Sequence, residues 1–354
     1  MKKTIILMMA MLWVLLVGCD SNQSVESETP KEEVPVLDVQ ETKNEAVDSG
    51  EAVKTQDVSR NAAWCVYWDP SPADSADKYS KYSDLVLFGC IYSEDYSLYI
   101  PDKLYELALK FSNKNVSSGQ ETYLSFINDV MHADGTSTQK STDFLKAVLS
   151  DPELSDRVID DMIKKAQTFG VNGIELDYEN VHKCDGFWAE YLDFVEKLYS
   201  RASAAGLKLR VVLMVATPVS DLNFIKGPQY VVMCYNLYGN HSGPGPKADE
   251  EFLKKTYDKF KSIDAGYALA NGGFEWGPND KAVRSLTAAD AAALAKEKGA
   301  EVTRDGSGAL TYSFQSDDGK HTVFYGDEQT IDRWSSILKN TANGNVGISL
   351  WKLE

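Results

Sequence analysis

The chain of 354 residues contains little histidine and no motif typical of a metal site. Its four His occur singly, and neither a His-Glu-x-x-His pattern nor a Cys-x-x-Cys pair is present. Proteins usually hold zinc through such spacings. The glycine-rich segment 239–246 also lacks the Gly-Lys-Ser/Thr of a phosphate-binding loop. We therefore expect no bound metal and no cofactor.

Basic residues are scarce relative to acidic ones. The sequence has 36 Lys and Arg against 53 Asp and Glu, which gives a formal net charge of −17. Proteins that bind nucleic acid need positive charge to neutralise phosphates, so this balance argues against a nucleic-acid partner. Nothing in the sequence indicates an obligate protein partner.

The N-terminal apolar run, from Ile5 to Val17, is too short for a comfortable membrane span. Lys2 and Lys3 precede it, as in a signal peptide. Its end, Leu16-Val17-Gly18-Cys19, resembles a bacterial lipobox, in which the Cys becomes lipidated. We expect residues 1–19 to be a lipoprotein signal peptide and Cys19 to anchor the protein outside the cytoplasm, on a bacterial membrane. An ordinary signal peptide or an uncleaved anchor is the alternative.

Residues 20–60 have no aromatic residue and a single Leu. They hold eleven acidic and four basic residues and so supply seven of the 17 excess negative charges. Such a segment cannot bury enough apolar surface to offset the entropy lost on ordering, and we expect a flexible acidic tether. Residues 61–354 carry every Trp after Trp13 and no second linker, which is typical of one large domain.

Within residues 61–354, apolar strand-like runs alternate with amphipathic helical patterns. This alternation, and the eight strands it predicts, favour a parallel (β/α)8 TIM barrel of the α/β class. The predicted strands are 62–68, 84–92, 121–127, 173–179, 207–215, 230–235, 266–271 and 346–351. The predicted helices are 103–111, 141–149, 156–169, 187–204, 249–262 and 328–340.

One passage departs from this rhythm. Between the seventh and eighth predicted strands lie a helical pattern at 287–298 and two alternating runs at 309–315 and 320–325. Asp317-Asp318-Gly319 separates the two runs, and Asp-Gly in this position is a hairpin signal. We expect a small α+β insertion here.

The fourth predicted strand carries an unusual row of acids. From Ile174 onward, apolar residues alternate with Glu175, Asp177 and Glu179, so the three carboxylates share one face. A row of buried charges would cost several kcal/mol if its only purpose were folding. In a barrel, the carboxyl ends of the strands form the active site, and Glu179 lies nearest that end. Catalytic acids are therefore one interpretation, and an edge strand with a solvated acidic face is the other.

The segment Asn172-Gly-Ile-Glu-Leu-Asp-Tyr-Glu179 resembles the Asp-Gly-x-x-x-Asp-x-Glu signature of glycoside hydrolase family 18, the chitinase-like (β/α)8 enzymes. The resemblance extends over nearly all of residues 61–354. The segments 238–246 and 324–327 look most like the branch of spore-cortex and related peptidoglycan N-acetylglucosaminidases. The matching strand ends are Tyr67-Trp68-Asp69, Met233-Cys-Tyr235-Asn236 and Ile348-Ser-Leu-Trp351.

The resemblance implies a retaining, substrate-assisted hydrolysis of β-linked N-acetylglucosaminyl glycans, with peptidoglycan favoured and chitin-type oligosaccharides the other option. Glu179 would be the general acid, and Asp177 would orient the substrate's 2-acetamido group with help from Tyr235. Trp351 would form the floor beneath the sugar. Tyr235 and Trp351 could instead be ordinary core residues at the barrel mouth. Substrate contacts are also expected from Tyr67, Met233 and Asn236.

The sequence departs from the family pattern at three positions. Asn172 stands where many members have Asp, Glu175 where the deep carboxylate is usually Asp, and Asn236 where many have Asp. Glu175 would still supply charge to Asp177, so that the cluster keeps a proton near neutral pH. We favour an active enzyme, and a chitinase-like lectin that binds amino sugars without turnover is the alternative.

Two further expectations concern aromatic and cysteine residues. Trp276 and Tyr312, in or beside the insertion, are either sugar-stacking residues or core aromatics. Of the cysteines after Cys19, Cys65 and Cys90 lie on neighbouring predicted strands, and a disulfide between them is the pairing to test.

Overall fold

The computed structural model describes residues 60–111 and 119–354. The leader 1–19 with Cys19, and the tether apart from Arg60, lie outside the described residues. Within the described ranges, no helix combines the length and the apolar character needed to cross a membrane.

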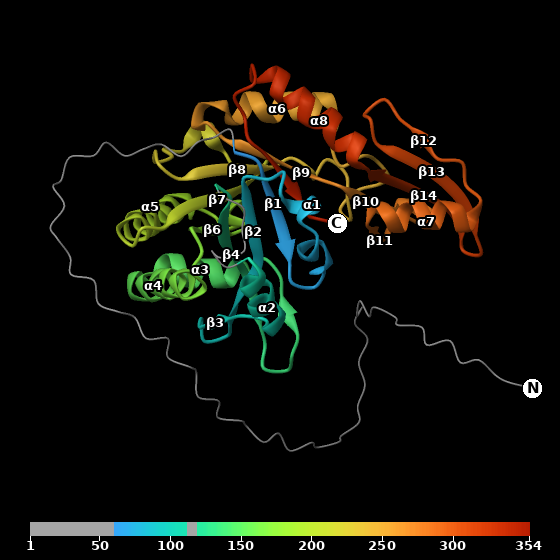
Figure 1. Cartoon of the computed structure of the whole chain (residues 1–354). Helices are drawn as coiled ribbons and strands as arrows, with labels where there is room; N and C mark the ends of the chain where they lie inside the picture. Colours follow the sequence, from blue (N-terminus) through green and yellow to red (C-terminus); the bar gives the residue numbers. More distant parts are fainter. Residues whose placement is uncertain (1–59, 112–118) are drawn as a thin grey trace, which may run out of the picture. The chain divides into compact units, whose positions relative to one another are not determined.

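Eight parallel strands close into a barrel, as the sequence predicts (Figure 1). Neighbours pair in the order β2-β1-β15-β9-β8-β7-β6-β4, and β4 pairs with β2 to close the ring. The strands are β1 (Ala62–Val66), β2 (Asp84–Ser93), β4 (Glu121–Met131), β6 (Gly173–Asp177), β7 (Lys208–Met214), β8 (Gln229–Met233), β9 (Gly266–Ala270) and β15 (Ile348–Trp351). Two short strands, β3 (Leu98–Tyr99) and β5 (Ser137–Thr138), extend β2 and β4 in antiparallel pairs.

Helices connect most of the barrel strands. Each predicted helix is present, with α4 starting four residues earlier than expected because Asp151 caps it and Pro152 opens it. The helices are α1 (Ala76–Tyr79), α2 (Asp102–Lys110), α3 (Thr142–Ser150), α4 (Pro152–Phe169), α5 (Trp188–Ala204), α6 (Glu250–Phe260), α7 (Ala288–Lys298) and α8 (Glu328–Thr341). Between β7 and β8 the only helical element is the short 3-10 turn Val219–Asp221.

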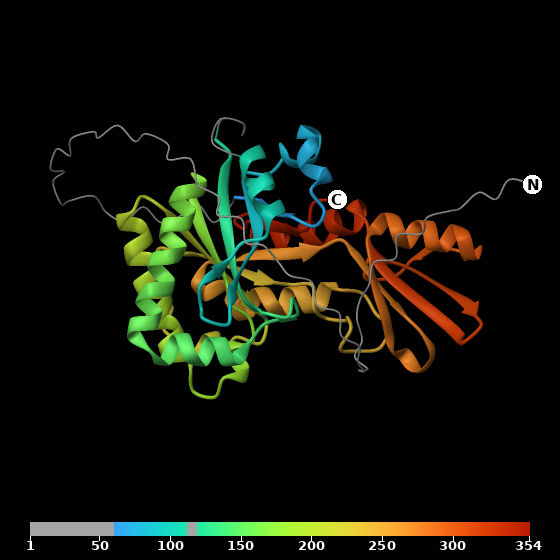
Figure 2. The same cartoon turned by 90° about the horizontal axis from the view of Figure 1, so that it is seen from below.

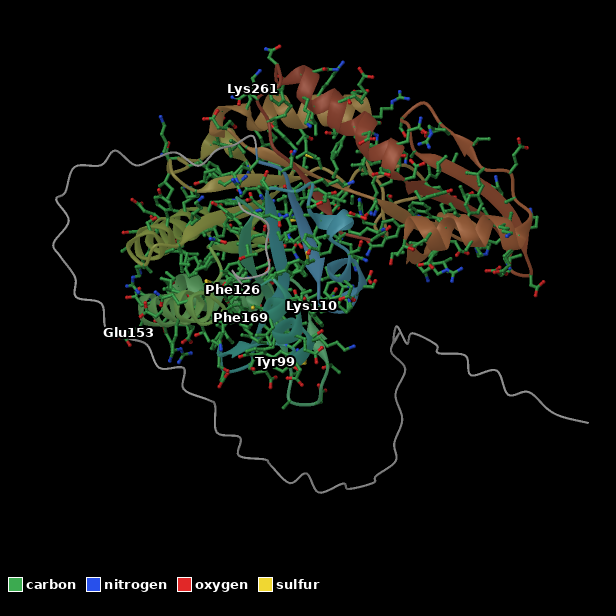
Figure 3. All side chains as sticks on the ribbon, in the orientation of Figure 1. Tyr99, Lys110, Phe126, Glu153, Phe169 and Lys261 are labelled. Carbon is green, nitrogen blue, oxygen red and sulfur yellow. The ribbon has the colours of Figure 1, made fainter. Side chains whose placement is uncertain are left out.

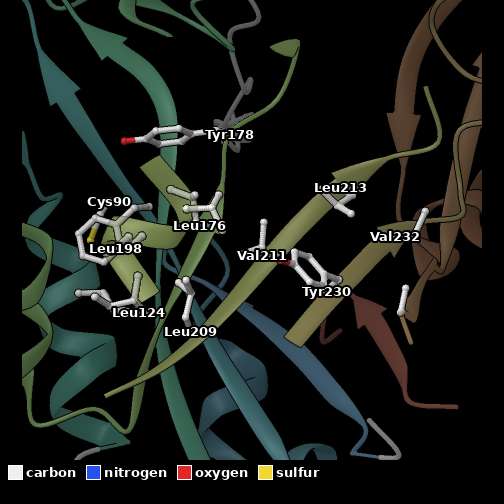
Figure 4. Close-up of a cluster of buried hydrophobic side chains, with 14 of the residues drawn as sticks. Cys90, Leu124, Leu176, Tyr178, Leu198, Leu209, Val211, Leu213, Tyr230 and Val232 are labelled. Atoms are coloured by element: carbon white, nitrogen blue, oxygen red, sulfur yellow. The ribbon is translucent and has the colours of Figure 1, made fainter. Parts of the chain in front are cut away.

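The main core lies between the strands and the surrounding helices. Leu176 of β6 and Tyr178 just beyond the strand point outward into it (Figure 4), and Ile174 belongs to the same buried cluster. This leaves the alternate residues of β6 facing the barrel interior, as period-2 alternation requires. Phe126 is buried in the same layer, whereas Glu153 and Lys261 extend from helix ends into solvent (Figure 3).

The insertion begins directly after β9 and forms its own sheet, in the order β11-β10-β14-β13-β12. It extends on the side of the barrel away from α3, α4 and α5 (Figure 2). The helix predicted at 287–298 is α7. The predicted hairpin is formed by β13 and β14, with the turn at Asp318. The insertion strands are β10 (Gly272–Trp276), β11 (Ala282–Leu286), β12 (Thr303–Arg304), β13 (Leu310–Ser316) and β14 (Gly319–Gly326).

Strands β10 and β11 were not predicted from the sequence. Glycine normally weakens a strand, and β10 opens with Gly272 and Gly273. The backbone explains both residues: Gly272 has a φ of +59°, and a Cβ on Gly273 would meet the carbonyl oxygen of Phe324 at 1.8 Å. Only glycine allows β10 to approach β14 this closely.

The expected disulfide is absent. Cys65 and Cys90 are free, buried thiols, as are Cys184 and Cys234. Cys65 pairs in register with Leu87, whereas Cys90 lies opposite Phe126 on the other side of β2. The two cysteines therefore do not face one another, and burial raises the pKa of the Cys65 thiol to about 12.

Candidate functional site

The strand with the acidic row is fixed at its start by backbone and amide contacts. Helix α4 ends at Gly170, whose φ of +65° turns the chain toward β6. Asn172 then joins the neighbouring strands: its Oδ1 accepts from Thr122 N at 2.8 Å, and its carbonyl accepts from Lys208 N at 3.0 Å. Asn172, one of the departures from the family signature, thus has a structural role here.

Glu179 lies two residues beyond the end of β6, at the carboxyl end of the barrel. Asn128, at the corresponding end of β4, holds the Glu179 backbone on both sides: its Oδ1 accepts from Glu179 N at 2.8 Å, and its Nδ2 donates to Glu179 O at 3.1 Å. The Glu179 side chain is 13% exposed. Because the backbone is held independently of the carboxylate, the acid is positioned by the fold itself.

Asp177 is the last residue of β6 and faces the barrel interior. Its carboxylate is buried, and Oδ1 has no hydrogen-bond partner. Burial, then the charges of Glu179 and Glu175, raises the pKa of Asp177 well above its usual range. The protonated form of Asp177 is therefore favoured more than in a solvated carboxyl, and a buried polar atom is left for a ligand to contact.

Glu175 lies deeper, and the structure gives it a partner that the sequence analysis did not identify. Arg210 of β7 donates from Nε to Glu175 Oε2 at 2.6 Å, and Trp64 donates from Nε1 to Oε1 at 2.7 Å. Arg210 also donates to Ser349 Oγ at 2.7 Å, and both charged side chains are fully buried. Burial raises the pKa of Glu175, and the contacts with Arg210 and Trp64 oppose this shift. Glu175 has no access to a ligand at the barrel mouth and can act only by supporting its neighbours.

Met233 ends β8, Tyr235 lies two residues beyond it, and Trp351 ends β15, all at the carboxyl end of the barrel. Burial, followed by the charges of Glu179 and Asp177, raises the pKa of Tyr235 well above its usual range, which shows that its side chain lies near these acids. Trp351 packs edge to face with Trp64 and contributes to the interior cluster that also contains Met233. The structure thus brings these three residues together with Asp177 and Glu179.

Tyr67 and Trp68 follow β1 at the mouth. Gly89 has a φ of +125°, and a Cβ there would meet the Tyr67 ring at 2.6 Å, so glycine makes room for Tyr67. Trp68 packs edge to face with Tyr67 and is 43% exposed. Trp68 was not predicted from the sequence as a site residue, and its exposed indole is available to a ligand. Asn236, just past β8, is exposed.

Trp276 and Tyr312 are core aromatics, the second of the two roles considered from the sequence. Trp276 is 1% exposed and donates from Nε1 to Ser242 O at 2.9 Å, which joins the insertion to the glycine-rich loop after β8. Tyr312 is 4% exposed and donates to Ala291 O at 2.7 Å. Neither ring is available to a ligand, so neither is a stacking residue in this structure.

Two charged residues near Glu179 were not identified from the sequence. Lys140, in the loop after β5, contacts the Glu179 carboxylate at 2.7 Å. Asp129 of β4 accepts from the Lys140 backbone N at 2.7 Å. Lys140 lies in a loop without periodicity, and Asp129 lies beyond the end of the strand predicted at 121–127, so only the fold reveals their position. Among the described residues, no group of three or more His, Cys, Asp or Glu is placed to hold a metal ion.

Asp177→Asn is expected to stabilise the protein. A carboxyl whose pKa is raised by folding weakens the folded state as the pH rises above the unfolded value of 3.8. The stability gain of Asp177→Asn should therefore be absent near pH 3 and grow as the pH rises toward 7. Urea unfolding at several pH values measures it. Asp193→Asn on the exposed surface of α5 is the matched control, and an equal gain in stability in both variants would contradict the assignment of the penalty to the buried Asp177 carboxyl.

The chain resembles proteins of known structure in its fold, at low sequence identity. No protein-family model and no curated protein sequence matches the chain. The spore cortex-lytic enzyme SleL of Bacillus cereus is 18% identical, with a TM-score of 0.66 over 84% of this chain and 72% of that one. A chitinase from Chromobacterium violaceum is 17% identical, with a TM-score of 0.66 over 83% and 94%. The GH18 chitinase of Cycas revoluta, solved in complex with (GlcNAc)3, is 15% identical, with a TM-score of 0.64 over 83% and 95%. The chain therefore has the TIM-barrel fold of these glycosidases.

Proposed function

We propose that this protein is a retaining glycoside hydrolase that cleaves β-linked N-acetylglucosaminyl glycans with assistance from the substrate's own acetamido group. One observation carries the proposal: Asp177, with an unpartnered buried oxygen, lies close enough to Glu179 and Tyr235 at this end of the barrel for the three groups to interact electrostatically. The fold shared with chitinases and a spore cortex-lytic enzyme supports it.

In the first step, protonated Glu179 would donate its proton to the glycosidic oxygen as the bond to C1 breaks. The carbonyl oxygen of the 2-acetamido group would attack C1 and form a bicyclic oxazolinium ion. Asp177 would bind the acetamide nitrogen, and the Tyr235 hydroxyl would donate to the acetamide oxygen. Both contacts hold the acetamide in line for attack, a positioning effect.

In the second step, Glu179, now a carboxylate, would take a proton from water as the water oxygen attacks C1 and the acetamide oxygen leaves. The two inversions at C1 give net retention of configuration. Trp351 and the exposed Trp68 would contact the faces of the sugar rings, where aromatic side chains bind carbohydrate well.

We favour peptidoglycan over chitin as the substrate because the pattern ending at Cys19 predicts a lipid anchor on a bacterial membrane. Such an anchor would keep the barrel at the cell envelope. Both the anchor and the location are proposals that rest on the sequence pattern.

The purified protein should release sugars from defined peptidoglycan fragments, and mass spectrometry of the products identifies the bond cleaved. Cleavage after N-acetylglucosamine is expected. Chitooligosaccharides of matched length serve as the comparison substrate. Binding of both glycan types without any product between pH 4 and pH 8 would refute the proposed function.

A further inference from the structure

Lys140 is held in place by its own backbone, independently of its side chain. Its N–H donates to Asp129 Oδ1 at 2.7 Å, and its carbonyl accepts from Asn180 Nδ2 at 3.3 Å. The next residue, Ser141, donates from N to Asn128 O at 2.8 Å. Lys140 has a φ of +51°, a conformation that costs an L-residue about 1 kcal/mol and persists only where the surroundings impose it. The fold therefore fixes the start of the Lys140 side chain beside Glu179.

The Lys140 ammonium pairs with the proposed general acid. Its Nζ lies 2.7 Å from each of the two Glu179 carboxylate oxygens. An ammonium in this position favours the ionised form of a carboxylate. A general acid must carry a proton to act, so the contact opposes the first step of the proposed reaction. Lys140 is 46% exposed and can be reached by a ligand at the barrel mouth.

The chemistry of the leaving sugar suggests what would displace this contact. Glu179 would protonate the oxygen that links C1 of one sugar to O4 of the next. In peptidoglycan, the sugar that leaves after cleavage at N-acetylglucosamine is N-acetylmuramic acid, whose O3 carries a lactyl group. O3 is adjacent to O4, so a group on O3 lies close to the Glu179 carboxyl and therefore close to the Lys140 ammonium. Chitin has a hydroxyl at this position and offers no anion.

We propose that Lys140 is a specificity residue that binds a carboxylate on the O3 substituent of the leaving sugar and, in doing so, releases Glu179 to take up the proton it donates. This inference rests on the proposed function and adds to it the substrate class, a glycan with an acidic sugar on the leaving-group side. Lys140 exchanges one carboxylate partner for another, and one proton enters from solvent onto Glu179.

The surroundings of Glu179 favour this uptake once Lys140 has turned away. The remaining groups that act on it electrostatically are mostly acidic or neutral, and Arg210 is already paired with Glu175. A carboxylate left among other acids is more easily protonated. The groups concerned are Asp129 on β4, Asp177 on β6, His182 in the turn after β6, and Tyr235 after β8.

If Lys140 binds a free carboxylate, another reaction must come before this one and expose that carboxylate. The lactyl group of muramic acid is a free carboxylate only where no peptide is attached to it. A hydrolase that cleaves the amide between lactate and peptide would therefore supply the preferred substrate.

The test uses two synthetic substrates that differ in one group. The first is the tetrasaccharide of alternating N-acetylglucosamine and N-acetylmuramic acid with free lactyl carboxylates. The second is the same glycan with the carboxylates converted to N-methyl amides. Values of kcat and KM are measured for the wild type, Lys140→Gln and Lys140→Arg, with Lys146→Gln on the exposed face of α3 as the charge-matched control. Binding of both glycans is measured calorimetrically.

The wild type should prefer the carboxylate substrate in kcat/KM by roughly tenfold, the size expected for a partly exposed charge-assisted contact. Lys140→Gln should lose this preference and gain activity on the amide, with the alkaline limb of its rate profile moved to higher pH. Lys140→Arg should retain the preference, and Lys146→Gln should match the wild type. Equal wild-type rates on the two substrates, or an equal loss on both in Lys140→Gln, would overturn the proposal.

Failure of the proposed function gives a different result. If no glycan is hydrolysed by any variant, the glycosidase proposal is refuted. Roughly tenfold tighter wild-type binding of the carboxylate glycan, abolished in Lys140→Gln, would then still support carboxylate recognition by Lys140. Equal binding of both glycans by the wild type would overturn carboxylate recognition by Lys140 as well.

Discussion

Glu179→Gln is expected to lower kcat by roughly 10²- to 10⁴-fold and to leave glycan binding nearly unchanged. The amide is almost the same size as the carboxyl but has no proton of suitable acidity to donate. Its position should be retained, because Asn128 holds the Glu179 backbone through the N–H and the carbonyl. Turnover measured with a fluorogenic chitobioside, and binding measured by calorimetry, separate the two effects.

Glu190→Gln on the exposed surface of α5 is the matched control and should retain wild-type rates. A Glu179→Gln variant with full activity would remove Glu179 from the mechanism. If the wild type and Glu179→Gln bind glycan equally and neither hydrolyses it, the protein is a lectin on a glycosidase fold.

Arg210→Met is expected to destabilise the protein by about 3 to 5 kcal/mol, because it leaves the Glu175 carboxylate buried without its cation. Arg210 contacts Glu175 at 2.6 Å and Ser349 at 2.7 Å, and neither charged side chain is exposed. The double variant Arg210→Met with Glu175→Gln removes both charges and should be more stable than Arg210→Met alone. Urea unfolding of the wild type, Arg210→Met, Glu175→Gln and the double variant gives four free energies, and the cycle isolates the interaction between the pair.

Arg201→Met is the control for loss of an arginine ion pair at the surface. Arg201 contacts Asp156 and Asp160 at 3.0 Å, but these side chains are substantially exposed, so the cost should be at most about 1 kcal/mol. If Arg210→Met lowers the free energy of unfolding no more than Arg201→Met does, Glu175 is not held in a buried ion pair.

The barrel was predictable because the same pattern of strand and helix recurs along the sequence. Each strand is a short apolar run between turn residues, and eight such runs alternating with helices leave few architectures. Strands β10 and β11 were not predicted because they depend on tertiary contacts. The pair Gly272 and Gly273 is typical of a turn, and only the close approach of the Phe324 carbonyl explains why glycine occurs in a strand here. The absence of a disulfide between Cys65 and Cys90 likewise follows from register, which local sequence does not determine.

The site was predictable only where its residues belong to a strand pattern. Alternation placed Glu175 and Asp177 on the interior face of β6, and the structure has them there. It gave no indication that Arg210, on the next strand, reaches across to Glu175, since that contact depends on how neighbouring strands are staggered. Lys140 lies 39 residues before Glu179 in a loop without periodicity, and only the closed barrel brings the two together.

The anomeric configuration of the first product tests the proposed chemistry most directly. Hydrolysis of a β-linked N-acetylglucosaminyl glycan by the wild-type protein, followed by ¹H NMR from the first minutes, distinguishes the two anomers before they interconvert. Attack by the substrate's acetamide, with Asp177 and Tyr235 holding it, predicts that the β anomer appears first and the α anomer only later, by mutarotation. An α anomer as the first product would contradict the proposed mechanism.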